Sequence, residues 1–170
     1  MSTTVPERPP LGGSTLNRKW YLDVDTDATG TTPTWVGVFG ITEFQDSLDS
    51  TLQDDSDFDS EGYKSQTKTA EAWALTFKAG RKVKASDATA YDEGQEFLRL
   101  KAGQMGPANS AKVRWYEMTP DGPRVEAYEG LAAVAYAPDG GGMDALSMAT
   151  FTLTGQGKRV PVSHPDVVTP

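Results

Sequence analysis

The 170-residue sequence has no cysteine and a single histidine, His164. It therefore contains no disulfide framework and no thiolate metal site, and one imidazole cannot form a two-histidine zinc site. No apolar run approaches the roughly 20 residues that a membrane-spanning helix needs, so we expect no membrane association. Positive charge is also scarce: 16 Lys and Arg against 24 Asp and Glu give a formal net charge of −8. Binding to a phosphate backbone needs clustered cations, so specific nucleic-acid binding is not expected.

Catalytic signatures are missing as well. His164 lies in a proline-punctuated segment, where a Ser–His–Asp triad would not be held rigidly. Gly155–Lys158 departs from a phosphate-binding loop, because Thr152 stands at the position of its first glycine and Arg159 at that of its hydroxyl. Acidic residues are many, but no two stand out as a pair for glycoside hydrolysis. We expect no catalytic, cofactor-binding or metal-binding residues, and a protein that is not an enzyme.

Residues 42–66 form a long polar stretch that we expect to be a loop, mobile in the monomer and ordered on assembly. It holds a dense acidic patch: Asp54, Asp55, Asp57, Asp59 and Glu61. A calcium loop of the EF-hand type requires Gly at its sixth position and Glu at its twelfth. Counted from Asp57, the twelfth residue is Lys68; counted from Asp55, the sixth is Ser60. An exposed acidic loop is therefore favoured over a calcium site.

What the sequence does contain is alternation of apolar and polar residues with a period of two, which predicts half-buried strands. The predicted strands cover 19–25, 34–39, 67–78 and 112–118, followed by a hairpin over 124–155 that turns at Asp139–Gly140. One helix is predicted from a cap at Ser86 or Asp87 to Gly103. The four tryptophans lie inside strands, which favours core packing over a sugar-stacking platform: Trp20, Trp35, Trp73 and Trp115.

The first strand of the 124–155 hairpin carries unusually small residues on both faces: Gly130, Ala132, Ala133 and Ala135. Small residues in a strand often mark the close approach of another backbone or group. Our hypothesis is that this hairpin completes a β-sheet with neighbouring copies of the protein.

The chain divides into three parts on this interpretation. Residues 1–18 are broken by prolines and glycines and form an N-terminal arm, either a disordered tail or an arm that orders against a partner. Residues 19–155 form one β-domain, with 42–66 as its long acidic loop. Residues 156–170 form a proline-rich C-terminal arm.

Several segments in this order resemble a known family: Arg18–Asp25 after an arm, Trp35–Ile41, the acidic loop Asp54–Gly62, Ala72–Trp73 before one helix, and Thr154–Lys158 after a long hairpin. Together they are similar to the major tail protein, or tail tube protein, of long-tailed non-contractile bacteriophages (siphoviruses), particularly those of actinobacterial hosts. The likeness covers nearly the whole chain.

This resemblance implies a β-sandwich or barrel with one flanking α-helix, a long inter-ring loop and extended N- and C-terminal arms. Six such subunits form a ring whose sheets join into an inner barrel, and the rings stack through 42–66, 1–18 and 156–170. The tube is related to those of contractile tails and type VI secretion. DNA passes through its lumen during genome ejection without specific binding. Implied partners are the tape measure, tail terminator and distal tail proteins. The implied location is the virion tail, assembled in the host cytoplasm.

Two further expectations remain open. The alternative function is a monomeric β-sandwich binding module that uses its tryptophans to bind carbohydrate. If the protein forms a tube, we expect a net negative lumen, with four cations facing outward or paired with carboxylates such as Glu71, Glu117, Glu126 and Glu129. The cations are Lys68, Lys78, Arg114 and Arg124.

Overall fold

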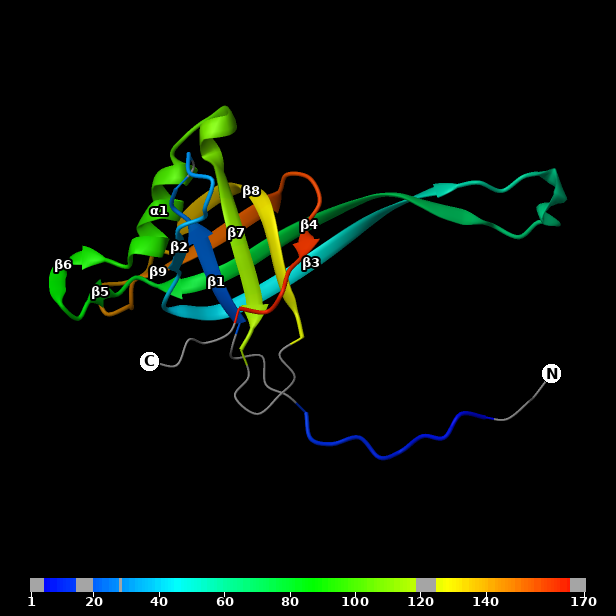
Figure 1. The fold of residues 1–170 in the computed structure, drawn as a ribbon, viewed down its shortest axis with the longest axis horizontal. Helices are drawn as coiled ribbons and strands as arrows, with labels where there is room; N and C mark the ends of the chain where they lie inside the picture. The colour runs from blue at the N-terminus through cyan, green and yellow to red at the C-terminus, as the bar shows by residue number, and fades with distance from the viewer. Residues whose placement is uncertain (1–4, 15–19, 28, 119–124, 166–170) are drawn as a thin grey trace.

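A computed structural model describes residues 5–14, 20–27, 29–118 and 125–165 (Figure 1). The described chain is mainly β-structure with one α-helix, as predicted. The strands are β1 (Trp20–Asp25), β2 (Trp35–Gly37), β3 (Ile41–Asp54), β4 (Gln66–Gly80), β5 (Val83–Lys84), β6 (Asp87–Tyr91), β7 (Ser110–Glu117), β8 (Ala127–Pro138), β9 (Met148–Gly155) and β10 (Val160–Pro161). The helices are α1 (Glu93–Ala102) and the short 3-10 turns η1 (Phe58–Ser60) and η2 (Gly106–Asn109).

Seven strands form one antiparallel sheet in the order β2-β1-β7-β8-β9-β4-β3, with β10 beside β8. Strand β8 joins the two halves, since it pairs with β7 through residues 127–133 and with β9 through 132–138. The halves face each other, because Trp115 of β7 stacks on Trp73 of β4 with ring centroids 5.0 Å apart. The sheet thus folds over as a β-sandwich.

The core follows the alternation predicted from sequence. Trp73, Leu75 and Phe77 are buried on β4, and Phe77 stacks on Phe151 of β9 at 4.9 Å. Trp115 is completely buried, and Trp73 nearly so. Core packing was therefore the correct interpretation for these two tryptophans.

The helix begins later than predicted. Residues 87–91 form strand β6, which pairs with β5, and the N-cap of α1 is Asp92, whose carboxylate accepts from the Gln95 amide at 3.0 Å. The helix lies close to β2: a Cβ on Gly94 would be 2.5 Å from the Gly37 carbonyl oxygen. Gly94, which weakens a helix in isolation, is thus required by this packing.

The prediction of a loop over 42–66 is wrong for most of its length. Strands β3 and β4 pair from Ile41↔Ala79 to Asp54↔Gln66, so only 55–65 remain as a turn. Strand β9 covers β4 only from Ala74 onward. The outer part, residues 49–72, is therefore a two-stranded ribbon, the hairpin arm, which projects far from the sandwich (Figure 1). Its polar residues lie on both faces because water surrounds it, so no half-buried pattern identified it as β-structure.

One of the small residues of β8, Gly130, has an explanation within the chain, as does Gly155 of β9. A Cβ on Gly130 would lie 2.4 Å from the Trp73 ring, and one on Gly155 would lie 2.3 Å from it. These residues make room for an indole. Strand β9 is paired along both edges, whereas β8 pairs with β9 alone from Val134 to Pro138. The hypothesis that this hairpin extends the sheet to neighbouring copies stays a prediction. The outermost strands of the sheet are β2 and β3.

The two terminal segments differ. Residues 5–14 are exposed and lie apart from the sandwich (Figure 1). Residues 156–165 instead follow β8: β10 pairs with it, and Trp73 Nε1 donates to the Gly157 carbonyl at 2.8 Å.

Candidate assembly surfaces

The free edge of β3 is the most extensive unpaired backbone in the described part of the chain. Strand β3 has 14 residues and pairs only with β4, whereas β2, the opposite edge, has three. A long open edge is a template for pairing with another chain. No described segment covers it, so β3 is the strand through which a second copy can extend the sheet.

The sheet formed by β3, β4, β9 and β8 carries small side chains on the face opposite the core. Three rows run across it in register. The central row is Gln45, Thr76, Thr152 and Ala135; its neighbours are Ser47, Ala74, Thr154, Ala133 and Glu43, Lys78, Thr150, Ala137. We call this surface the Ala/Thr face. Only Glu43 and Lys78 are charged in these rows, so the face is smooth and nearly neutral.

The tip of the hairpin arm is an ordered turn. Asp57 caps η1 by accepting from the Asp59 amide at 3.0 Å, and Thr67 donates to Asp55 at 2.5 Å. Hydrogen bonds from Ser56 lower the pKa of Asp54, and those from Thr67 and Ser65 lower the pKa of Asp55. These carboxylates are used in holding the turn, and the described residues contain no cluster of His, Asp and Glu suited to a metal ion.

The tip also exposes apolar side chains. Phe58 and Tyr63 are largely or fully exposed, and Leu48 and Leu52 are about half exposed along β3. Contact with another molecule would remove these apolar side chains from water, which is favourable, so the ribbon is suited to such a contact.

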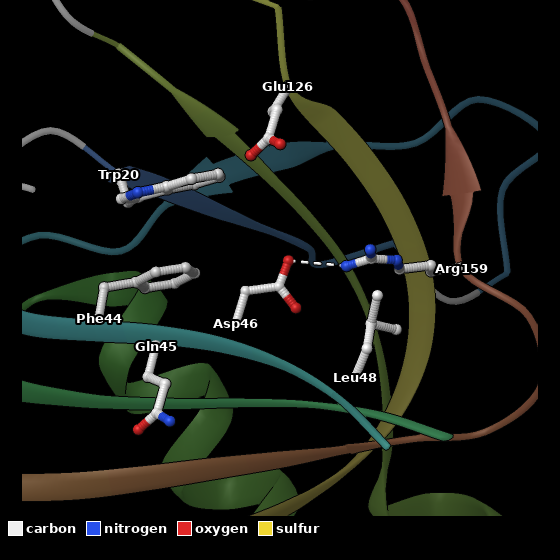
Figure 2. A pocket seen from close by; sticks show the side chains of 7 residues that line it. All are labelled: Trp20, Phe44, Gln45, Asp46, Leu48, Glu126 and Arg159. Atoms are coloured by element: carbon white, nitrogen blue, oxygen red, sulfur yellow. Dashed lines mark hydrogen bonds and ion pairs between the residues drawn. The ribbon is translucent and has the colours of Figure 1, made fainter. Parts of the chain in front are cut away.

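A groove of about 500 Å³ opens between β1 and β3 (Figure 2). Trp20 and Phe44 stack at one end, with centroids 5.5 Å apart and nearly parallel rings. At the other end Asp46 Oδ2 accepts from Arg159 at 2.7 Å and from the buried Trp115 indole at 3.0 Å. We call this the aromatic groove; its lining is Trp20, Phe44, Gln45, Asp46, Leu48, Glu126 and Arg159.

A second polar cluster joins β1 to β7. Asp23 Oδ2 accepts from Arg114 at 2.6 Å and from the Tyr116 hydroxyl at 3.1 Å, and the Arg114 guanidinium lies 4.6 Å from the centre of the Trp35 ring. Burial, and secondarily the Asp23 carboxylate, raises the pKa of Tyr116 to about 12. Period-two patterning could not reveal this cluster or the groove, because both join strands distant in sequence.

Three of the four cations singled out in the sequence are paired. Lys68 contacts Glu71 at 2.6 Å, Lys78 contacts Asp139 at 3.7 Å, and Arg114 contacts Asp23. Lys68 pairs with one of the four glutamates named in the sequence analysis, whereas Lys78 and Arg114 pair with aspartates. Arg124 lies outside the described residues.

The remaining candidates have structural roles. His164 Nε2 lies 2.6 Å from the Glu117 carbonyl oxygen, and its ring meets the Tyr116 ring edge to face. Gly155 and Gly157 contact Trp73 at the end of β9. Burial of Trp73 and Trp115 leaves no four-tryptophan platform for sugars. None of the helices in the described ranges has the length and apolar character needed to span a membrane.

Comparison with known proteins yields similarity at the level of fold. No protein-family model and no curated protein matches the sequence. Among solved structures, a chain of the native gene transfer agent (GTA) virion is 10% identical with a TM-score of 0.58, over 88% of this chain and 100% of that one. The SPP1 tail tube is 16% identical with a TM-score of 0.56, over 89% and 80%. A chain of the anti-feeding prophage (AFP) baseplate is 11% identical with a TM-score of 0.54, over 89% and 97%.

Proposed function

We propose that this chain is a structural tail tube protein, whose copies self-assemble into stacked hexameric rings. The observation that carries the proposal is a fold shared over nearly the whole chain with components of a GTA tail and the SPP1 tail tube. One of those tails is described with C6 symmetry. The long free edge of β3 supports it independently, since an open edge of 14 residues calls for a partner strand.

Ring formation proceeds in this proposal through β3. Its edge pairs with the next copy, so that the β3-β4-β9-β8 sheets join into one barrel without open edges. The Ala/Thr face then lines the channel. A channel lined by small, nearly neutral side chains has no clustered cations to bind the DNA phosphates and no large groups to obstruct the DNA. Glu43 and Lys78 balance within the three rows, so a net negative lumen would need carboxylates outside these rows. The net negative lumen expected from the sequence stays a prediction.

Stacking of rings uses the hairpin arm. A ribbon that projects from its own domain (Figure 1) and exposes Phe58 and Leu52 is the part of the chain that contacts a copy in the next ring in this proposal. An obligate interface of this type buries on the order of 2,000 Å² or more. The terminal segments 1–18 and 156–170 add contacts between rings.

The wider biological setting is part of the same proposal. The tube belongs to a long non-contractile tail of siphovirus type and carries the genome during ejection. Its ends and interior contact tail terminator, distal tail and tape measure proteins, and it assembles in the host cytoplasm before residing in the virion.

Electron microscopy of the purified protein over a range of concentrations tests the proposal. We expect rings or tubes of constant width that grow with concentration, and a matching high-mass species in size exclusion. A strict monomer at high concentration that binds glycans saturably would refute the proposal and favour the carbohydrate-binding alternative.

A further inference from the structure

A small pocket lies where the segment before β3, the end of β4, strand β5 and the start of α1 meet. Its volume is about 200 Å³. Phe39 and Val83 form its apolar lining, and they are 70% and 49% exposed. Lys82 and Lys84 also line it, and we call it the lysine pocket. Two exposed apolar side chains around a hollow favour an occupant that removes them from water.

The lysine pocket carries unpaired positive charge. Lys82 has no ion-pair partner among the described residues, and Lys84 reaches Glu93 only at 4.0 Å, the limit of an ion pair. Asp92, the acidic residue of the lining, is already used: its carboxylate accepts from the Gln95 amide at 3.0 Å and from a second backbone amide at 3.4 Å. The pocket therefore suits an apolar group that is accompanied by a carboxylate.

The tip of the hairpin arm presents that combination. Phe58 is fully exposed and stands between two carboxylates in the sequence, Asp57 and Asp59. Asp57 caps η1 and accepts from the Ser60 hydroxyl at 3.0 Å. Asp59 is exposed, and its carboxylate has no partner among the described residues. Because the turn is already held by these hydrogen bonds, docking of Phe58 requires little ordering of the backbone.

The tip and the lysine pocket lie at opposite ends of the molecule. The hairpin arm projects from one end of the sandwich, and the β5–β6 hairpin lies at the other end along the longest axis (Figure 1). The tip therefore cannot reach the pocket of its own chain. Different patches at opposite ends make a head-to-tail contact, which repeats from copy to copy in an open assembly. Stacked rings require a contact of this kind.

We propose that the lysine pocket receives the arm tip of a second copy in the adjacent ring. Phe58 enters the pocket between Phe39 and Val83, and Asp59 pairs with Lys82. An aromatic anchor in a pocket supplies affinity, and the complementary charges beside it fix the register. The inference rests on the proposed function and adds the surface that receives the arm.

Charge exchange within one chain tests this contact. Asp59→Lys and Lys82→Glu alone should each lower the yield of tubes at a fixed protein concentration about fivefold or more, because every copy loses a partly exposed ion pair and gains a like-charge contact. The chain that carries both substitutions regains the pair in reverse and should restore the yield. A second substitution would not restore a chain that had failed to fold.

The matched control places the reversed charge elsewhere on the same arm. Asp49 is exposed on the outer part of β3, and Asp49→Lys should not restore the tubes of Lys82→Glu. Equal rescue by Asp49→Lys and Asp59→Lys would overturn the contact, because the effect would then follow from net charge alone.

Cross-linking of natural tubes tests the contact without any substitution. A carbodiimide joins a carboxylate to an amine that lies beside it. In tubes assembled from mixed heavy-isotope and light-isotope chains, we expect mixed-isotope peptides that join Asp59 to Lys82 or Lys84. Cross-links from Asp59 to lysines elsewhere, with none to these two, would assign the tip to another surface and overturn the proposal.

The outcomes separate this inference from the proposed function. Natural tubes whose yield is unchanged by both single reversals, or is not restored by the double variant, would overturn the pocket contact and leave the tube standing. A natural chain that forms no tubes would overturn the function and the contact together.

Discussion

Trp73 determines the identity of two glycines that are distant from it in sequence. Its ring packs between the backbones of β8 and β9 at Gly130 and Gly155, and its indole nitrogen donates to Gly157. Together, these contacts of Trp73 with the three glycines hold the C-terminal segment against the sandwich. The indole leaves no room for a Cβ at positions 130 and 155. A smaller ring at position 73 should therefore allow a larger residue than glycine at these positions.

Replacement of Gly130 by Ala should destabilise the monomer by about 1–3 kcal/mol, because the added methyl overlaps the Trp73 ring. In a Trp73→Phe background the same change should cost clearly less. Urea unfolding of the natural chain, the two single variants and the double variant gives a double-mutant cycle. Gly12→Ala, with nothing within 4 Å of the added Cβ, is the control. Equal costs in both backgrounds would show that the two residues do not interact as described.

Tyr116 makes stability depend on alkaline pH. Burial and Asp23 raise its pKa to about 12, whereas an unfolded tyrosine titrates near 10. The folded state holds this proton more tightly, so its contribution to stability is full below about pH 10 and is lost as pH rises toward 12. Unfolding free energies across this range should fall more steeply for the natural chain than for Tyr116→Phe. Parallel curves would contradict the shift.

At the scale of elements, α1 is anchored by one buried amide. Gln95 is 1% exposed, and its Nε2 donates to the Phe39 carbonyl at 2.6 Å and to the Gly80 carbonyl at 3.1 Å. Its Oε1 accepts from Arg81 at 3.1 Å. The residue therefore ties the helix to the segment just before β3 and to the end of β4.

Gln95→Leu should lower the free energy of unfolding by about 2–4 kcal/mol, because it removes the amide donor to the Phe39 and Gly80 carbonyls and the acceptor of an Arg81 N–H. Thermal or urea unfolding measures the loss. Gln104→Leu, at an exposed position after the same helix, should change stability by less than about 0.5 kcal/mol. If the two substitutions are equivalent, the buried network is not what holds α1.

A substitution at the tip of the hairpin arm should impair the stacking of rings without changing the stability of the monomer. Phe58 is fully exposed, so Phe58→Asp should leave monomer unfolding unchanged within about 0.5 kcal/mol. The same variant should form rings that fail to stack, because the tip loses its apolar contact. Leu100→Asp, on the exposed face of α1, is the matched control. Long tubes of Phe58→Asp in electron microscopy would remove the tip from the stacking interface.

At the scale of the whole molecule, sequence patterning was sufficient for most core strands and insufficient for the surfaces, and the sandwich architecture was expected from the family resemblance. Alternation found the core of β4, β7 and β9, because one face of each strand is buried. It missed β3, whose outer half is solvated on both faces. It also placed the helix cap at Ser86 or Asp87 instead of Asp92, since all three are good caps. The groove at Trp20 and Phe44 depends on tertiary packing, which no local pattern encodes.

The most direct test of the account is a cryo-electron microscopy map of the assembled protein. It should show six copies per ring, with β3 of each copy paired to its neighbour and the Ala/Thr face lining the channel. A ring closed through another surface, with the β3 edge left open to solvent, or a channel lined by unpaired lysines and arginines, would contradict it.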